Sequence, residues 1–310
     1  MTEADIAAAH WGGRDLRLIR ARENTVYQMR LPDGGLAALR LHREGYQAAA
    51  AIRSELWWCE ALAGAGLPVP GPVPSASGEM LVGLDGGRHA SAVRWLAGAP
   101  FGLAGVPLAG PAAERVARHR ALGELVARVH RATDKLTLPK WFQRPRWDVE
   151  GLVGEAPLWG RFWDHPALER DEGAELGAAR QFLRDQIGRH ASAGGDFGLI
   201  HADVLRENVL MNEGALSLID FDDSGFGFRL YDLGTVMSQS LYQADYVDLR
   251  DALAEGYGGQ RAADVNMIEV FTLARTCASV GWTMPRVAAA DPVHRGHIAR
   301  AVMCFRKVAG

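Results

Sequence analysis

The 310-residue sequence has few of the features that mark secreted, zinc-binding or membrane-spanning proteins. Its three cysteines, Cys59, Cys277 and Cys304, are too far apart for a zinc motif, and an odd number does not suit a disulfide framework. No uninterrupted apolar run approaches the ~18 residues that a membrane-spanning helix needs. Residues 1–13 lack the basic stretch and apolar run of a signal peptide. We therefore expect a cytoplasmic protein.

The chain also lacks a strong overall charge. Its formal net charge is −3 at pH 7, with 23% charged and 48% hydrophobic residues. Such a balance creates no field that would attract nucleic acid or an anionic membrane, so we expect neither as a partner. A local phosphate pocket is still allowed, because it needs only a few donors. The length suffices for a sizeable core in one or two domains, and the sequence leaves the oligomeric state open.

Short strand-like runs dominate the first ninety-odd residues. The predicted strands cover residues 16–20, 26–31, 36–42, 80–84 and 89–95. Pro32-Asp33-Gly34-Gly35 is a hairpin turn signal between the second and third. Residues 48–63 carry apolar side chains at helical spacing and predict the single helix of this part. Residues 68–74 are rich in proline, which excludes a helix and predicts an extended connector.

A Gly/Pro-rich stretch from residue 96 to 111 marks the main change of composition, and helical patterns follow it. We expect helices over residues 112–131 and 172–189, and a small buried β-hairpin within residues 199–220. The fold class predicted is α+β: an N-terminal lobe, residues 1–97, with an antiparallel sheet and one helix, and a mainly helical C-terminal lobe, residues 98–310. This order fits a two-lobed fold with a ligand between the lobes.

One segment concentrates the polar residues with a chemical pattern. Apolar residues bracket His201, Asp203, Asn208 and Asp220, so these four should lie at the ends of buried strands and in the loop between them. Transfer of the γ-phosphate of ATP to a hydroxyl needs an acceptor for the hydroxyl proton and oxygen ligands for Mg²⁺. Two carboxylates and one amide oxygen supply those groups. The pattern therefore favours an ATP- and Mg²⁺-dependent phosphotransferase.

This segment resembles the catalytic loop and metal-binding aspartate of the aminoglycoside phosphotransferase/choline kinase superfamily, whose fold is like that of protein kinases. The resemblance implies that Asp203 is the catalytic base, that Asn208 and Asp220 bind Mg²⁺, and that His201 orients the loop. It also implies that Asp232, at the start of a helix, braces that loop. The cofactors expected are ATP and Mg²⁺.

The first lobe is similar to the branch that contains stress response kinase A and type II homoserine kinases. The similarity lies in residues 22–27 and 37–43, which correspond to the phosphate-covering hairpin and the nucleotide-binding strand. By this resemblance Asn24, Thr25 and Arg40 bind ATP. Arg40 replaces the usual lysine, which keeps the charge but changes its geometry. The hairpin also lacks the usual glycines, so its grip on ATP should come from Asn24 and Thr25.

Two carboxylates near these residues allow more than one interpretation. Glu55, on the predicted helix, is the natural partner of Arg40, because kinases hold this cation with a helix carboxylate; otherwise it is a solvated surface residue. Asp222 is either a further metal ligand or, with Asp223, a brace for the turn that follows.

Other conspicuous residues fit structural roles. We interpret His130 as a core histidine with its hydrogen bonds satisfied, and His42 and His119 as solvated. The aromatic residues of segment 141–163 are first of all packing, with acceptor binding as the alternative. From residue 147 to 169 carboxylates alternate with aromatics, which suggests the riskier hypothesis that the acceptor carries an amine.

The main functional hypothesis is a kinase that phosphorylates a hydroxyl of a small molecule: an amino alcohol, amino acid, sugar or aminoglycoside. A protein Ser/Thr kinase similar to stress response kinase A and a nucleotide-binding pseudokinase are the alternatives. The motifs indicate the superfamily but do not choose the acceptor.

Overall fold

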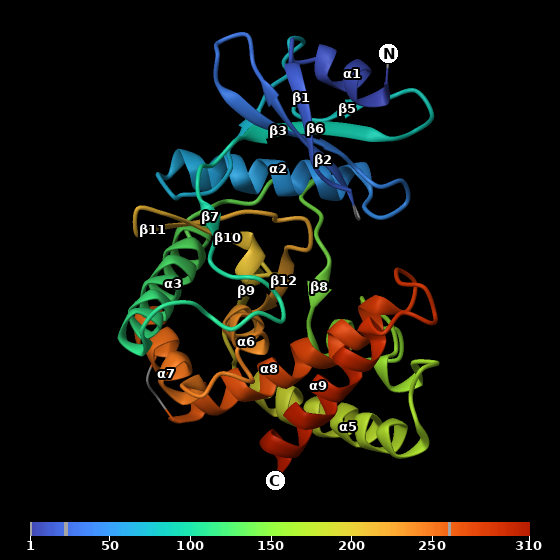
Figure 1. Ribbon diagram of the computed structural model, residues 1–310, viewed down its shortest axis with the longest axis vertical. Coiled ribbons are helices and arrows are strands. Elements are labelled where there is room, and N and C mark those ends of the chain that lie inside the picture. The colour runs from blue at the N-terminus through green and yellow to red at the C-terminus, as the bar shows by residue number, and fades with distance from the viewer. Residues whose placement is uncertain (1, 22–23, 260–261) are drawn as a thin grey trace. The chain divides into compact units, whose positions relative to one another are not determined.

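The computed structural model describes residues 2–21, 24–259 and 262–310, which form two compact units (Figure 1). Unit 1 contains residues 1–99, 135–144 and 210–222, and unit 2 contains residues 100–134, 145–209 and 223–310. Each unit therefore gathers segments that are distant in the sequence. The predicted lobe boundary at residue 97/98 stays a prediction, since two later segments belong with the first part of the chain. No helix in the described part of the chain is long and apolar enough to cross a membrane.

Unit 1 is built on an antiparallel sheet with the strand order β1-β2-β3-β6-β4, in which β5 also pairs with β6. Its strands are β1 (Arg14–Ala21), β2 (Thr25–Arg30), β3 (Leu36–Leu41), β4 (Pro72–Val73), β5 (Val82–Gly83) and β6 (His89–Arg94). The antiparallel N-terminal sheet predicted from the sequence is confirmed. The register places Arg40 of β3 opposite Val26 on one side and Ser91 on the other, in the middle of the sheet.

Helix α2 (Ala49–Gly64) is the predicted helix of this part, and it lies against the sheet (Figure 1). Ile52 and Leu56 of α2 pack with Leu81 and Val93 in one hydrophobic cluster, as their helical spacing requires. This packing fixes the rotation of α2 about its axis. The buried Glu55, one residue before Leu56, is thereby directed into the protein.

Helix α1 (Glu3–Ala9) was not predicted from the sequence. Its start is stabilised by a capping box, in which Thr2 and Asp5 exchange hydrogen bonds with each other's backbone and side chain. Ala4, Ala7 and Ala8 share the core cluster of the sheet strands. These alanines are too weakly apolar to give a clear helical pattern in the sequence. Their small size lets α1 pack closely on the sheet.

The remaining strands form two small sheets. One has the order β11-β10-β7, with β7 (Ala99–Pro100), β10 (Val209–Asn212) and β11 (Ala215–Leu218); β10 and β11 are the predicted buried hairpin. The other, in unit 2, has the order β8-β12-β9, with β8 (Arg146–Trp147), β9 (Phe197–Ile200) and β12 (Gly225–Phe228). Because β9 leads directly to His201 and β10 directly follows Asn208, these strands hold both ends of the predicted catalytic loop.

Unit 2 is otherwise helical. Its helices are α3 (Ala112–Thr133), α4 (Val149–Val153), α5 (Arg170–Ser192), α6 (Leu230–Ser238), α7 (Tyr246–Tyr257), α8 (Ala262–Thr283) and α9 (Val293–Ala309), with short 3₁₀ turns η1 (Phe162–Asp164) and η2 (Arg206–Asn208). Helix α6 packs on α8, and α8 packs on α9 (Figure 1). A small sheet covered by helices confirms the predicted helical C-terminal part.

Helices α3 and α7 approach each other unusually closely. A Cβ atom added to Gly123 of α3 would lie 2.1 Å from the carbonyl oxygen of Leu253, and one added to Gly256 of α7 would lie 1.9 Å from that of Arg120. Only glycine fits at both positions. The close crossing brings Tyr257, at the end of α7, within hydrogen-bond distance of His130 on α3.

Candidate active site

The loop between β9 and β10 has a strained backbone at its centre. Ala202 has a φ of +65°, a left-handed conformation that alanine rarely adopts. On either side, the backbone N–H of Asp203 donates to Nδ1 of His201 at 3.2 Å, and the N–H of Leu205 donates to the carbonyl of Asp203 at 2.7 Å. This turn is what points the Asp203 side chain out of the loop.

Asp232, in the first turn of α6, holds that strained turn in place. Its two carboxylate oxygens accept the backbone N–H groups of His201 at 2.9 Å and Ala202 at 2.7 Å. Nε2 of His130 lies 3.0 Å from the same carboxylate. All four residues are buried. The predicted bracing role of Asp232 is confirmed, and so is the interpretation of His130 as a core histidine, since its Nδ1 also meets the Tyr257 hydroxyl at 2.9 Å.

The carboxylate of Asp203, the predicted base, has a defined partner on each oxygen. Nδ2 of Asn208 donates to Oδ2 at 2.8 Å and also to the Asp203 carbonyl at 3.0 Å. Nη2 of Arg275 donates to Oδ1 at 2.7 Å. Because the Asn208 nitrogen faces Asp203, its amide oxygen is left as a free acceptor group. Unit 2 thus brings together His201, Asp203 and Asn208, all three predicted from the sequence.

Arg275, on α8, is the residue of this cluster that sequence reasoning missed. It is 5% exposed, its Nη1 donates to the Ser279 hydroxyl at 2.5 Å, and its guanidinium lies 4.6 Å from the centre of the Trp159 ring. The hydrogen bond and the cation–π contact fix the orientation of the guanidinium. The hint in the sequence was a charged residue within residues 270–283, a stretch that has no other charged residue.

Unit 1 places Arg40 among carboxylates. Its Nη1 lies 2.5 Å from Oε1 of Glu55 and its Nη2 lies 3.2 Å from Oδ1 of Asp222. Burial by itself would lower the pKa of Arg40. The nearby carboxylates of Glu55, Asp222 and Asp220 together have a larger effect and raise the pKa of Arg40 above its ordinary value. The predicted pairing of Arg40 with Glu55 is therefore confirmed, and the solvated alternative for Glu55 is wrong, because Glu55 is 1% exposed.

Asp222 connects the other members of the group. Its Oδ2 accepts a hydrogen bond from Nδ2 of Asn24 at 3.2 Å, and its carbonyl oxygen accepts one from Nη2 of Arg144 at 2.5 Å. Burial raises the pKa of Asp222 to about 7, against the effect of Arg40 and together with that of Glu55 and Asp220. These contacts fit a bracing role for Asp222. Thr25 opens β2, whereas Arg22 and Glu23 of the predicted hairpin lie outside the described residues.

The donors present suit Mg²⁺. Asp220 and the free amide oxygen of Asn208 are hard oxygen ligands, the type that Mg²⁺ prefers. The buried acids Glu55 and Asp222, with the half-buried Asp220, also form an excess of negative charge around Arg40 that a divalent cation would offset. No cluster of three His, Cys, Asp or Glu side chains able to hold a metal occurs within residues 2–21, 24–259 and 262–310. That is compatible with Mg²⁺, which takes one or two protein ligands and fills its shell with water and phosphate oxygens.

Two histidines expected to be solvated are instead buried, at 3% exposure for His42 and 1% for His119. Nε2 of His42 contacts the Ser91 hydroxyl at 2.8 Å, on the neighbouring strand β6. Nδ1 of His119 contacts the Arg115 carbonyl at 2.8 Å, and burial lowers the pKa of His119 to about 4. His42 directly follows β3, and His119 lies on the buried face of α3. A single histidine among mixed neighbours does not reveal either position.

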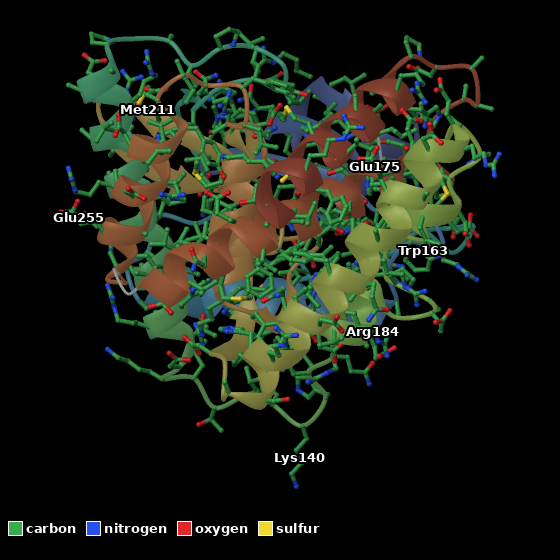
Figure 2. All side chains as sticks on the ribbon, turned by 90° about the horizontal axis from the view of Figure 1, so that it is seen from below. Lys140, Trp163, Glu175, Arg184, Met211 and Glu255 are labelled. Atoms are coloured by element: carbon green, nitrogen blue, oxygen red, sulfur yellow. The ribbon has the colours of Figure 1, made fainter. Side chains whose placement is uncertain are left out.

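The hypothesis of an amine-binding segment at residues 147–169 stays a prediction, although the structure gives the aromatic and acidic residues of this segment structural partners. Trp147, Trp159 and Phe162 are buried core residues. Each acidic residue of the segment is paired with an arginine: Asp148 with Arg146, Glu150 with Arg184, Glu155 with Arg180, Asp164 with Arg161, and Glu169 with Arg295. Figure 2 shows Trp163 and Arg184 at α5. The negative charge that was to attract an amine is thus neutralised locally and largely solvated.

A shallow hollow of about 800 Å³ lies along the exposed face of α5 and includes Gln181, Arg184 and Asp185. It contains none of the predicted site residues and opens widely to solvent. Size alone therefore does not identify the site. The polar groups around Asp203 in unit 2 and those around Arg40 in unit 1 are the better guides.

Comparison with known families gives one match over most of the chain. The model of a family described as "Phosphotransferase enzyme family" matches residues 15–266. An uncharacterised protein of Deinococcus radiodurans is 30% identical over 262 residues, which cover 81% of this chain and 71% of that protein.

Two characterised relatives are similar at comparable levels. A homoserine kinase of Neisseria meningitidis is 28% identical over 169 residues; the match covers 53% of this chain and only about half, 52%, of that kinase. Among solved structures, a microcompartment-associated aminopropanol kinase is similar with a TM-score of 0.85 and 27% identity, over 99% of this chain and 95% of that one. The fold of this chain is thus that of small-molecule kinases.

Proposed function

This chain belongs to the phosphotransferase enzyme family, and from that premise we propose that it transfers the γ-phosphate of ATP to a hydroxyl group of a small molecule. It is an enzyme, a kinase with an alcohol group as acceptor. The observation that carries the proposal is the geometry of Asp203: a carboxylate oriented on one side by Asn208 and on the other by Arg275, in a loop fixed by Asp232.

In the proposed reaction Asp203 is the catalytic base. It orients the acceptor hydroxyl and takes its proton as the hydroxyl oxygen bonds to the γ-phosphorus and the bond to the β-phosphate oxygen breaks, releasing ADP. The contacts to Asn208 and Arg275 restrict the rotation of the carboxylate, so little reorganisation is needed. His201 supports the loop by accepting the N–H of Asp203.

The nucleotide is the proposed ligand of unit 1. Arg40, fixed by Glu55, would bind the phosphates of ATP, and Asn24 and Thr25 would contact them from the hairpin that precedes β2. Mg²⁺ would be held by Asn208 and Asp220, which lie just before and just after the β10–β11 hairpin. When bound, the ion would offset the negative charge that develops on the phosphate oxygens.

The acceptor is proposed to be a short hydroxyl compound. The names of two relatives, an aminopropanol kinase and a homoserine kinase, both point to three- or four-carbon alcohols that carry an amine. Homoserine carries a carboxylate, which aminopropanol lacks. The relatives alone do not choose between them.

The test is a screen of ATP consumption by the purified protein with Mg²⁺ and amino alcohols, hydroxy amino acids, sugars and aminoglycosides. We expect turnover with at least one short alcohol and loss of several orders of magnitude in kcat for Asp203→Asn, with the KM for ATP retained. The exposed Asp171→Asn is the matched control. Turnover that requires a protein substrate, or ATP binding without any turnover, would refute the proposal in favour of a protein kinase or a pseudokinase.

A further inference from the structure

A second arginine accompanies Arg275 near the predicted base. Two side-chain contacts set the register of the antiparallel pair α8 and α9: Lys307 lies 4.0 Å from Glu269, and His294 lies 3.0 Å from Thr283. Arg300, between these two points of α9, is thereby placed at the level of Arg275 and Ser279 on α8. The two guanidiniums therefore belong to one neighbourhood.

Arg300 has no acidic partner within ion-pair distance among the described residues, which include the whole of α9. Its Nη2 donates to Nδ1 of His297 at 2.7 Å. Its Nε is buried and makes no hydrogen bond, and the same is true of the Nε of Arg275. Buried cationic donors without an acceptor are costly, so their retention suggests an acceptor that arrives with a ligand.

The surroundings agree with an excess of positive charge. Burial, reinforced by Arg275, lowers the pKa of Arg300 below its ordinary value. Burial, Arg300 and Arg275 also lower the pKa of His297 to about 3, so this histidine is neutral and accepts the hydrogen bond from Arg300. Asp203 forms an ion pair with Arg275. Glu207 acts on Arg300 only from beyond ion-pair distance, and its two oxygens already accept hydrogen bonds from the Ala104 N–H and from Gln239. Among the described residues, Arg300 is thus the guanidinium of this pair that has no carboxylate bound to it.

We propose that Arg300, together with Arg275, binds a carboxylate of the acceptor, so that the substrate is a short hydroxy acid or hydroxy amino acid and not an amino alcohol. This inference rests on the proposed kinase activity and specifies its substrate class. A carboxylate supplies one negative charge and matches the planar donors of a guanidinium.

The opposite preference has less support in the structure. An amine on the acceptor would need a carboxylate other than Asp203, and the acids of residues 147–169 already have arginine partners. The aromatic face of Trp159, which could bind a cation, is in contact with Arg275. The guanidinium of Arg275 therefore already occupies the aromatic face that could bind a cationic ligand. We expect the ligand to supply an anionic group instead.

Matched acceptor pairs test the proposal directly. L-homoserine against 3-amino-1-propanol, and L-threonine against 1-amino-2-propanol, differ only by the carboxylate; glycerol 3-phosphate against glycerol tests a phosphate instead. We expect kcat/KM at least tenfold higher for one carboxylate member than for its decarboxylated partner. Equal or better use of the amino alcohol would overturn the inference while leaving the kinase activity established, and so would a preference for glycerol 3-phosphate. Absence of turnover with every acceptor would instead count against the proposed function.

The variant Arg300→Gln tests the residue itself. We expect it to raise the KM for the carboxylate acceptor about tenfold or more, with the KM for ATP unchanged and little effect on the decarboxylated acceptor. Arg300→Lys should recover part of the affinity. The exposed Arg131→Gln on α3 is the control for loss of a surface charge. An equal fall in kcat with both members of a pair would mean that Arg300 acts on the transferring phosphate, and would refute its assignment to the carboxylate.

Discussion

Replacing Asp232 with asparagine should destabilise the protein and impair turnover without any change in side-chain shape. The carboxylate accepts three hydrogen bonds on two oxygens: from His201 N–H and His130 Nε2 on one, and from Ala202 N–H on the other. A carboxylate only accepts, so His130 must donate here. An amide has one accepting oxygen, and its NH₂ group would face at least one of these donors.

The magnitude follows from the least damaging orientation. If the amide oxygen keeps the His201 and His130 bonds, the NH₂ group meets the N–H of Ala202, a residue that is fully buried. An unpaired buried N–H costs ~1–3 kcal/mol, and the two remaining bonds lose the strength that the charge gave them. We therefore expect a loss of about 3 kcal/mol, which corresponds to a fall in Tm of roughly 6–10 °C for a chain of this size. The left-handed turn at Ala202 loses a support, so kcat should fall too.

Thermal unfolding of wild type and Asp232→Asn, in parallel with ATP turnover, measures both effects. Asp171→Asn, an exposed change of the same chemistry in the first turn of α5, should shift Tm by no more than 1–2 °C. An Asp232→Asn protein with the wild-type Tm would show that the three hydrogen bonds do not hold the turn. A lowered Tm with unchanged kcat would show that the hydrogen bonds of Asp232 stabilise the fold but are not needed for turnover.

Further predictions concern the nucleotide and the metal. The variant Asp220→Asn keeps a residue type that tolerates the left-handed φ of +66° at this position. It should abolish activation by Mg²⁺ in a titration of ATP turnover. Unchanged activation would move the metal assignment to Asp222. Arg40→Ala should raise the KM for ATP and, by leaving Glu55 buried without its cation, lower stability by ~3–5 kcal/mol. Glu55→Gln should raise the KM for ATP less; unchanged ATP kinetics in Arg40→Ala would assign the phosphate contact to another cation.

Local patterns predicted the parts of the site that lie close together in the sequence. His201, Asp203 and Asn208 fall within one loop between two apolar strands, so their association follows from the strands that bracket them. The pairing of Arg40 with Glu55 was predictable for a related reason: a central strand and the helix after it pack on each other, and their periodicity fixes which side chains face inward.

Long-range partners were not predictable in this way. Arg275 meets Asp203 although 72 residues separate them, because α6 and α8 pack together and the rotation of α8 directs this side chain inward. The arginine partners of the acids at residues 147–169 come mostly from other elements, such as Arg180 and Arg184 of α5. A sequence shows that charges exist, but their pairing depends on which helix faces lie opposite.

The sequence by itself determined the family, the α+β class and the position of the loop proposed to be catalytic, because hydrophobic periodicity and turn chemistry act over a few residues. Only the tertiary structure decided the charge balance around Asp203. That balance depends on Arg275 and Arg300, which reach one neighbourhood through the antiparallel packing of α8 and α9. Electrostatic interactions in a protein interior act through space and are strengthened by burial, so they are set by packing and not by order along the chain.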